Sequence, residues 1–358
     1  MKFSRASYIN IMNWDDLRIA YAPYHKDLTA PGDRRRFVFY ANERKIKFDI
    51  ADLSKKYDIV YLTYGCNISA WIEYKKKNPE VKLVFELIDS YLLENTSILT
   101  IFRGATRYLL KKENKFWLDY KVALHEIIKI VDAVVCSTQA QKVGMLEFNK
   151  NVYTSLDYFS NDINYRKTSL KNSKKFKLVW EGQAHTVNNL LVLNDVFERL
   201  DIEFELYIIT DPVIKSKVDF FDKKTSQVLS KLKCKYYFLN WNKFSFSENI
   251  ANADLAIIPI FSNKSMMWNK PENKLLLMWE IGIPTLTSTT PAYKQVMDAA
   301  GLNMYCSSSN DWVKKIEEYM KSPIQHRISI VKKANDYLRE FHNKNRILKN
   351  WDEIFNSL

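Results

Sequence analysis

Short unbroken apolar runs recur along the chain, and longer segments with helical spacing separate them. Such runs, bounded by polar residues, are typical of strands that a parallel sheet buries on both faces. Their alternation with helices predicts an α/β fold. The predicted strands are Ala6–Met12, Tyr57–Thr63, Val81–Ile88 and Asp132–Thr138 in a first series, then Phe176–Trp180, Glu203–Thr210, Cys234–Leu239, Ala253–Ile260, Thr285–Thr287 and Asn303–Cys306 in a second.

Helices are predicted between these strands. The first is expected to run from Arg34 to about Arg44, with Asp33 as its N-cap, after a loop-rich segment from Asp15 to Gly32. A single long helical region is expected over Ile98–Ile130. The other predicted helices are Ile68–Lys77, Asn188–Leu200, Ser245–Ala251, Asn273–Glu280, Ala292–Ala300 and those from Ser309 onward.

The polar segment Asp157–Lys175 lacks periodicity and separates the two series. It is therefore predicted to be a linker between two domains. We expect an N-terminal Rossmann-like acceptor domain over residues 1–160 and a C-terminal Rossmann-like donor domain over 176–325. Helices in 326–358 are expected to pack back toward the first domain.

Composition narrows the class of protein. The chain has 358 residues, of which 47% are hydrophobic and 27% charged, which suits globular domains. The net charge of +13 fits nucleic acid, an anionic membrane surface or phosphorylated substrates. Four isolated cysteines predict reduced thiols and no zinc site. The N-terminus is too polar for a signal peptide, and no apolar run approaches the length of a membrane span.

The stretch Trp268–Ser288 joins a basic loop, an apolar helix and a short strand. Pro271 suits the first turn of this helix and Gly282 its end. A helix N-terminus offers N–H groups and the positive end of its dipole to a phosphate. The candidate phosphate ligands at this end are Lys270, Asn273 and Lys274.

The order Asp254, Pro259, Asn273-Lys274-Leu275, then Gly282-Ile283-Pro284 resembles the donor-binding half of GT-B glycosyltransferases of bacterial polysaccharide biosynthesis, with a family-4-like C-terminal domain. The resemblance implies two Rossmann-like domains whose parallel sheets face a central cleft. It also implies a nucleotide-sugar donor, no cofactor and no metal.

The family pattern assigns roles to residues of the Trp268–Ser288 stretch. Lys274 would stabilise the leaving phosphates, and Glu272 would hold hydroxyl groups of the sugar or ribose. Glu280 is placed in the donor site because Glu272 and Glu280 keep an E-x7-E spacing. The glutamate that the family has five residues before the helix-ending glycine is Leu277 here, so the nucleotide base stays undetermined.

A second donor-binding element is predicted at the strand end Trp180-Glu-Gly-Gln-Ala-His185. Ligands bind at the carboxyl ends of strands in open parallel sheets, and Gly182 permits close backbone approach to a diphosphate. Gln183 and Asn188 stand where similar enzymes have Arg and Lys. The predicted donor-binding residues of this element are Gly182, Gln183 and His185; a plain strand–turn–helix connection is the alternative.

In the first domain, three consecutive arginines open a predicted helix, where cations oppose the helix dipole. This conflict indicates an anion near Gly32, Arg34 and Arg35, although a solvated basic turn is equally consistent with it. Asp89 follows a buried strand and is the candidate base for the acceptor hydroxyl, with a helix cap as its alternative role.

The segment Ile98–Lys121 mixes apolar and aromatic residues with cations, which suits a helix on an anionic membrane or an ordinary amphipathic core helix. The expected lipid-facing cations are Arg103, Arg107, Lys111 and Lys112.

Together these features predict a metal-independent glycosyltransferase that acts on a glycan or polyprenyl-linked acceptor in bacterial surface polysaccharide synthesis. It is expected to be cytoplasmic, peripheral on the inner membrane face, with no nucleic-acid partner. A non-catalytic sugar-nucleotide-binding subunit of a glycosyltransferase complex is the main alternative. A nucleic-acid-binding protein is a weaker one, because only the charge favours it.

Overall fold

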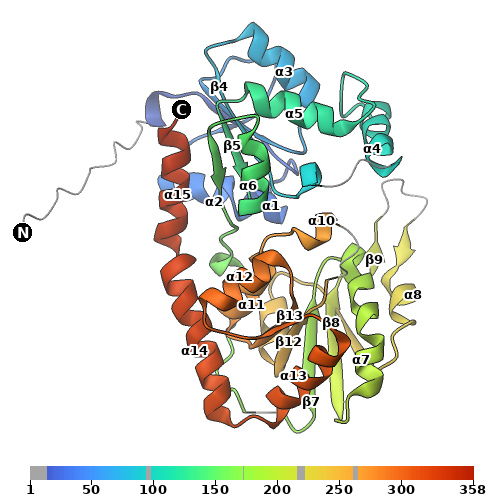
Figure 1. Cartoon of the computed structure of the whole chain (residues 1–358). Helices are drawn as coiled ribbons and strands as arrows, with labels where there is room; N and C mark the ends of the chain where they lie inside the picture. Colours follow the sequence, from blue (N-terminus) through green and yellow to red (C-terminus); the bar gives the residue numbers. More distant parts are fainter. Residues whose placement is uncertain (1–13, 94–97, 172, 216–221, 261–264) are drawn as a thin grey trace, which may run out of the picture. The chain divides into compact units, whose positions relative to one another are not determined.

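The structure of the protein is a computed structural model. The structure describes residues 14–93, 98–171, 173–215, 222–260 and 265–358. The chain divides into two compact units, shown in Figure 1. Unit 1 comprises Met1–Tyr158 and Lys344–Leu358, and unit 2 comprises Phe159–Asn343. The predicted strand Ala6–Met12 lies outside the described residues.

Within the described residues, unit 1 holds a six-stranded parallel sheet in the order β2-β1-β3-β4-β5-β6. Its strands are β1 (Ile19–Ala22), β2 (Asp49–Ile50), β3 (Ile59–Thr63), β4 (Lys82–Leu87), β5 (Ala133–Cys136) and β6 (Val152–Thr154). Its helices are η1 (Trp14–Asp16), α1 (Pro31–Arg34), α2 (Phe37–Arg44), α3 (Ile68–Lys77), η2 (Tyr91–Leu93), α4 (Ile98–Leu109), α5 (Tyr120–Ile130), α6 (Gln139–Leu146) and α15 (Lys344–Asn356).

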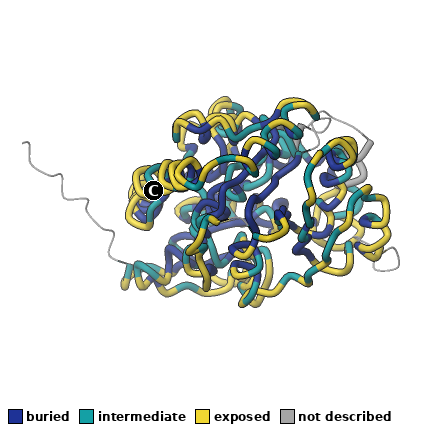
Figure 2. Tube along the Cα trace, turned by 90° about the horizontal axis from the view of Figure 1, so that it is seen from below, coloured by how far each residue is buried: buried dark blue, intermediate teal, exposed yellow. Residues whose placement is uncertain are grey.

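Alternate residues of these strands enter two cores, one on each face of the sheet. On one face, Val60 and Leu62 pack with side chains of α3 and α5. On the other face, Ile59 and Tyr61 pack with side chains of α2 and α15, including Trp351. Buried strand segments are dark blue in Figure 2. Two covered faces explain why the strands are apolar throughout.

In the described part of unit 2, a second six-stranded parallel sheet has the order β11-β8-β7-β12-β13-β14. Its strands are β7 (Phe176–Glu181), β8 (Phe204–Thr210), β11 (Tyr236–Asn240), β12 (Leu255–Ile258), β13 (Thr285–Ser288) and β14 (Tyr305–Cys306), and a separate antiparallel pair is β9 (Val213–Ile214) with β10 (Lys223–Lys224).

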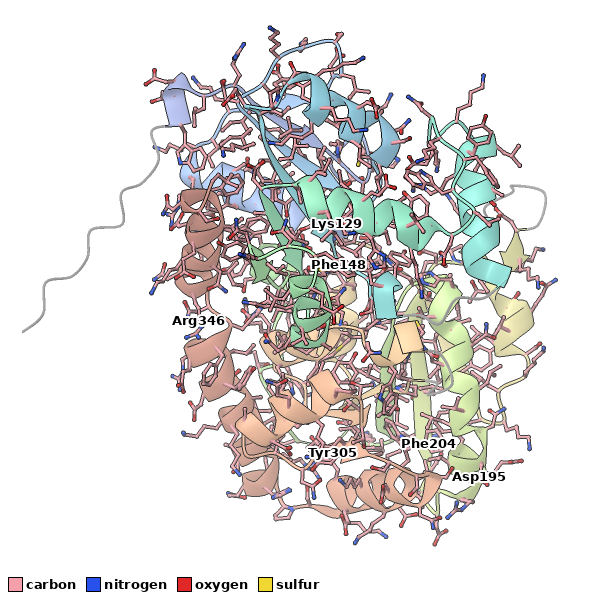
Figure 3. All side chains as sticks on the ribbon, turned by 45° about the horizontal axis from the view of Figure 1, so that its top comes forward. Lys129, Phe148, Asp195, Phe204, Tyr305 and Arg346 are labelled. Carbon is pink, nitrogen blue, oxygen red and sulfur yellow. The ribbon has the colours of Figure 1, made fainter. Side chains whose placement is uncertain are left out.

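The helices of unit 2 are listed here in chain order: η3 (Ser160–Asp162), η4 (Ala184–Leu193), α7 (Asn194–Arg199), α8 (Thr225–Leu229), α9 (Phe246–Ala251), α10 (Ser265–Trp268), α11 (Asn273–Ile281), α12 (Pro291–Ala299), α13 (Ser309–Lys321) and α14 (Ile324–Phe341). Gly282 ends α11 with φ +87°, a left-handed conformation that glycine adopts without strain. Aromatic rings join helix to sheet, as Phe204 of β8 does with Phe197 of α7 at 5.8 Å between centroids (Figure 3).

Several predicted elements differ from the structure. The loop-rich Asp15–Gly32 segment contains β1, whose run of four apolar residues is short and directly followed by Pro23. The predicted helix Asn188–Leu200 is a 3-10 segment, η4, followed by α7. The predicted Ile98–Ile130 helix is two helices, because Lys111 adopts φ +55° after α4 and Asp119 caps α5.

The helix predicted from Arg34 begins differently as well. It is divided into α1 and α2, and Ala30 rather than Asp33 is the residue before the first turn. Asp33 is buried and instead accepts hydrogen bonds from the Tyr21 hydroxyl at 2.5 Å and the Tyr24 amide at 2.8 Å. Its carboxylate therefore fixes the loop after β1, a long-range role that local sequence does not encode.

Candidate functional site

The carboxyl end of β7 and the first turn of α11 meet in unit 2. The Lys274 ammonium group donates a hydrogen bond to the main-chain carbonyl of Glu181, and lies 3.4 Å from the Glu181 carboxylate oxygen Oε2. It also lies 5.4 Å from the ring centroid of Trp180. Both predicted donor-binding elements therefore converge within one unit. Their parallel β–α topology places strand ends and helix N-termini on the same edge of the sheet.

Gly182 continues from β7 into this contact. Its amide donates to the carbonyl of Ile209 in β8 at 3.1 Å, which fixes the backbone at the strand end. A Cβ atom at position 182 would lie 2.8 Å from the Lys274 ammonium nitrogen and 2.7 Å from a ring carbon of Trp180. Only glycine leaves this space open, because real Cβ atoms do not approach other heavy atoms so closely.

Gly182→Ala is expected to lower donor affinity by about tenfold to a hundredfold, because the added methyl group displaces the Lys274 ammonium from the strand end. Nucleotide-sugar titration of the wild-type and variant proteins measures the change. Gly301→Ala is not a suitable control, because Gly301 has φ +65° and an alanine there would strain the backbone. The control is Ser226→Ala on the exposed face of α8, which should leave donor affinity unchanged. Equal affinity in Gly182→Ala and wild type would contradict the assignment.

The first turn of α11 presents main-chain N–H groups that the helix itself does not use. Glu272 is the residue before this turn, and its side chain makes no capping hydrogen bond. Asn273 is the first helical residue. These features provide the site with the positive end of a helix dipole beside the Lys274 ammonium, an arrangement that favours an anion.

Glu272 is half-buried, and desolvation raises the pKa of its carboxyl group from 4.5 to about 7. The same carboxylate raises the pKa of the buried Tyr293 phenol in α12, after desolvation of that phenol. A carboxyl group that titrates near neutrality can accept a hydrogen bond from a sugar hydroxyl when ionised and donate one when protonated.

This pKa predicts a pH dependence of stability. The folded protein holds the Glu272 proton more tightly than the unfolded chain does, so the carboxyl contributes stability below about pH 4.5 that is lost as pH rises through about 7. Compared with Glu272→Gln, wild type should therefore lose unfolding free energy between these values. Urea denaturation of both proteins across this range tests this expectation; parallel pH profiles would contradict the raised pKa of Glu272.

Glu181 belongs to this candidate site by its contacts, and the sequence analysis did not single it out. It is the last residue of β7, its side chain is 12% exposed, and both its carbonyl and its carboxylate face Lys274. The sequence feature that could have indicated it is its position directly before Gly182 in the strand-end motif. Its charge partly neutralises Lys274 and holds the ammonium at the strand end.

The other residues predicted for donor binding are placed as follows. Gln183 and His185 are exposed at the start of η4, directly after Gly182. Lys270 is half-buried in the segment between α10 and α11. Their roles in donor binding stay predictions.

Glu280 lies six residues after Lys274, about 9 Å along the helix. There its carboxylate accepts hydrogen bonds from Ser160 at 2.6 Å and from Arg166 at 2.8 Å. These contacts are at the opposite end of α11 from Glu272, so the shared E-x7-E spacing does not bring the two carboxylates together. The contacts support a structural role for Glu280, which connects residues 160–166 to α11. Its role in donor binding stays a prediction.

The candidate residues of unit 1 lie in two places, after β4 and in or directly after α1. Asp89 comes two residues after β4, and its carboxylate accepts a hydrogen bond from the Tyr91 hydroxyl at 3.3 Å. The Arg34 side chain donates to the carbonyl of Thr29 at 2.7 Å, and the Arg35 carbonyl accepts from the Tyr158 amide. A Cβ at Gly32 would lie 2.8 Å from the Tyr24 ring, so close packing accounts for this glycine.

Arg36, the third arginine of the cluster, has an internal role. It is fully buried and pairs with Glu86 at 2.5 Å and Asp157 at 3.2 Å, and it donates to the Ser155 carbonyl at 2.8 Å. Glu86 also accepts from the Tyr61 hydroxyl at 2.7 Å. The conflict between an arginine and the helix dipole is thus offset at this position by protein carboxylates rather than by a bound anion.

The described residues contain no group of three or more His, Cys, Asp or Glu side chains placed to hold a metal ion. None of the helices in the described ranges is both long and apolar enough to span a bilayer.

Comparison with known proteins identifies the fold. No family model matches the chain, and no curated protein matches it. Solved structures do match: Anabaena HepE in complex with UDP-glucose, at 11% identity and a TM-score of 0.59 over 96% of this chain and 100% of that one. A glycosyltransferase from Rickettsia africae matches at 13% identity with a TM-score of 0.57. The match covers 89% of this chain and 86% of that one.

TarM from S. aureus matches at 13% identity and a TM-score of 0.53, over 83% of this chain. The chain spans about half of TarM, 55% of its length. With its two parallel sheets, the chain therefore has the GT-B glycosyltransferase fold, which confirms the fold class expected from the sequence.

Proposed function

We propose that this chain is a glycosyltransferase that transfers a sugar from a nucleotide-sugar donor to a glycan or lipid-linked acceptor. The observation that carries the proposal is the contact of Lys274 with the strand end at Glu181 and Gly182. A cation, a glycine and a helix N-terminus together form a place for a diphosphate. The structural neighbours support the donor class, because HepE has been solved with UDP and with UDP-glucose.

The chemistry follows from the charge that develops during transfer. As the glycosidic bond of the donor breaks, the leaving nucleotide gains negative charge, and fixed positive groups lower that barrier. Lys274 and the first-turn N–H groups of α11 would supply this stabilisation. Glu181 would hold the ammonium in place before the donor arrives. Glu272 would bind sugar or ribose hydroxyls, and Asp89 would accept the proton of the acceptor hydroxyl.

A sugar-nucleotide-binding subunit without catalysis is the second candidate. Two observations favour it: the Lys274 ammonium is already paired with Glu181, and buried Leu277 stands where the family has its ribose-binding glutamate. Such a protein would bind donors and leave them intact.

Nucleotide release separates the two candidates. The purified chain is incubated with a panel of nucleotide sugars, with and without glycan and polyprenyl-phosphate acceptors, and the freed nucleotide is measured. Release with at least one donor, stimulated by an acceptor, supports transfer. Saturable binding without release from any donor would favour the non-catalytic subunit, and absence of binding would contradict both.

A further inference from the structure

A surface in unit 1 exposes an unusual concentration of large apolar side chains. Of the sixteen large hydrophobic residues exposed in the described parts of the chain, six fall within residues 108–122. We call this surface the 108–122 patch. Its apolar members, with the exposed fraction of each, are Tyr108 (44%), Leu109 (77%), Leu110 (51%), Phe116 (49%), Leu118 (68%) and Val122 (47%). These residues are close in sequence, and the Tyr108 and Phe116 rings are in edge contact, with 5.9 Å between their centroids. Large exposed apolar patches mark interaction sites.

The same patch is basic on its outer side. Lys111, Lys112 and Lys115 are exposed between the apolar residues. Three acids lie nearby: Glu113 is 2% exposed, the Asp119 carboxylate accepts from the Lys121 amide as the N-cap of α5, and the exposed Glu73 of α3 pairs with Lys76. The outward charges of the segment are therefore predominantly positive, and its partner should be anionic.

Buried contacts hold the patch in this conformation. The Glu113 carboxylate accepts from the Ile68 and Ser69 amides at the start of α3, at 3.1 and 2.9 Å, and from the Tyr120 hydroxyl at 2.8 Å. The Trp117 side chain is buried as well. Thus the segment buries Glu113 and Trp117 while leaving leucines and a phenylalanine in solvent. Folded domains usually bury apolar side chains and expose charged ones, and this segment does the reverse. The buried contacts of Glu113 keep the segment's apolar side chains in fixed positions.

Arg107 belongs to that support rather than to the outer surface. Its guanidinium group donates to Glu113 at 3.1 Å and to the Cys66 carbonyl at 2.6 Å, and lies 4.8 Å from the Tyr120 ring centroid. The expectation that Arg107 faces lipid headgroups is therefore wrong. The Arg103 side chain lies outside the described residues, and Lys111 and Lys112 are the members of the expected set that are exposed.

We propose that the 108–122 patch docks on the surface of an anionic lipid bilayer. Its leucines and phenylalanine would enter the boundary between headgroups and acyl chains, and its lysines would contact lipid phosphates. A second copy of the chain is disfavoured as the occupant, because its patch would oppose lysines with lysines. The inference rests on unit 1 alone and does not depend on the donor site proposed in unit 2.

The test uses the full chain and vesicles of phosphatidylcholine, with or without 40% phosphatidylglycerol. We expect sedimentation with the anionic vesicles, weakened by added salt because surface charges are screened. The triple variant Lys111→Gln, Lys112→Gln and Lys115→Gln should lower the partition coefficient about a hundredfold, since each cation at such a surface contributes about fivefold. The triple variant Leu109→Ser, Phe116→Ser and Leu118→Ser should lower it at least about tenfold through lost apolar insertion.

Matched controls change equally exposed residues elsewhere. Leu53, Phe244 and Ile328 are exposed, and replacing all three by Ser should leave sedimentation unchanged. A second control variant combines Lys56→Gln, Lys77→Gln and Lys231→Gln. It removes three exposed lysines and the same total charge as the patch variant, and it should also leave sedimentation unchanged. These controls separate the patch from the general effect of the net charge of +13.

Circular dichroism melts verify that each variant is folded. The proposal is overturned if wild type stays in the supernatant with anionic vesicles, an outcome that would point to an acidic protein as the partner. It is equally overturned if patch and control variants sediment alike. Donor titration of the patch variants should match wild type, so failure of the docking proposal and failure of the proposed function are distinguishable.

Discussion

Lys274→Ala is expected to lower the turnover of sugar transfer by a factor of about a hundred or more, the effect typical of removing one electrostatic stabiliser of a leaving group. Lys274 is the cation that the structure places at the β7 strand end, in contact with Glu181 and against Gly182. The residues where similar enzymes carry further cations are Gln183 and Asn188. The loss should therefore not be compensated there. Steady-state kinetics with the donor that shows release in the panel measures it.

Lys294→Ala is the matched control for that experiment. Lys294 is also on a helix of unit 2, but it pairs with Asp298 on an exposed face of α12. Its replacement should leave turnover within about twofold of wild type, as is usual for exposed ion pairs. An equal effect of the two substitutions would show that Lys274 acts only through overall charge or folding.

Arg36→Ala is expected to lower the free energy of unfolding of unit 1 by about 3–5 kcal/mol, the range for breaking a buried ion pair. The substitution leaves the buried Glu86 and Asp157 carboxylates without their shared cation. Burial already raises the pKa of Glu86, against the opposing effect of Arg36, so the variant should gain stability relative to wild type as pH falls and Glu86 is protonated.

Arg18→Ala provides the comparison within the same unit. Arg18 pairs with Asp58 at 3.1 Å, but its side chain is 64% exposed, and such pairs contribute about 0–1 kcal/mol. Chemical denaturation of both variants measures the two losses. Similar losses would contradict the view that the arginine cluster at the start of α2 is partly a core feature.

Much of the fold follows from pattern alone. The runs at residues 59–62 and 255–258 are apolar because their strands are buried on both faces of a sheet, and this signal is local. The sequence pattern does not predict features that depend on tertiary contacts. The Asp33 carboxylate, for example, accepts a hydrogen bond from the Tyr21 hydroxyl instead of capping a helix. The break after α4 depends on Glu113, whose partners lie some forty-five residues earlier in the chain.

The candidate site divides in the same way. The proximity of Gly182 and Lys274 follows from the sequence pattern, because parallel topology brings strand ends and helix N-termini to one edge of the sheet. Their role in donor binding stays a prediction. The contact of Glu181 with Lys274 could not be predicted. A strand pattern carries no information about a lysine ninety-three residues later in the chain. Arg36 looked identical to its neighbours Arg34 and Arg35, and only burial distinguishes it.

The most direct test of the central claim is calorimetric titration of wild type and Lys274→Ala with UDP-glucose, UDP-N-acetylglucosamine, GDP-mannose, dTDP-glucose and CMP-sialic acid. If the β7–α11 edge is a nucleotide-sugar site, at least one donor saturates wild type at one molecule per chain. Lys274→Ala should bind the same donor at least about tenfold more weakly, because a charge-assisted contact to phosphate is lost. A donor that binds both proteins equally, or the absence of binding by any of them, would contradict the claim.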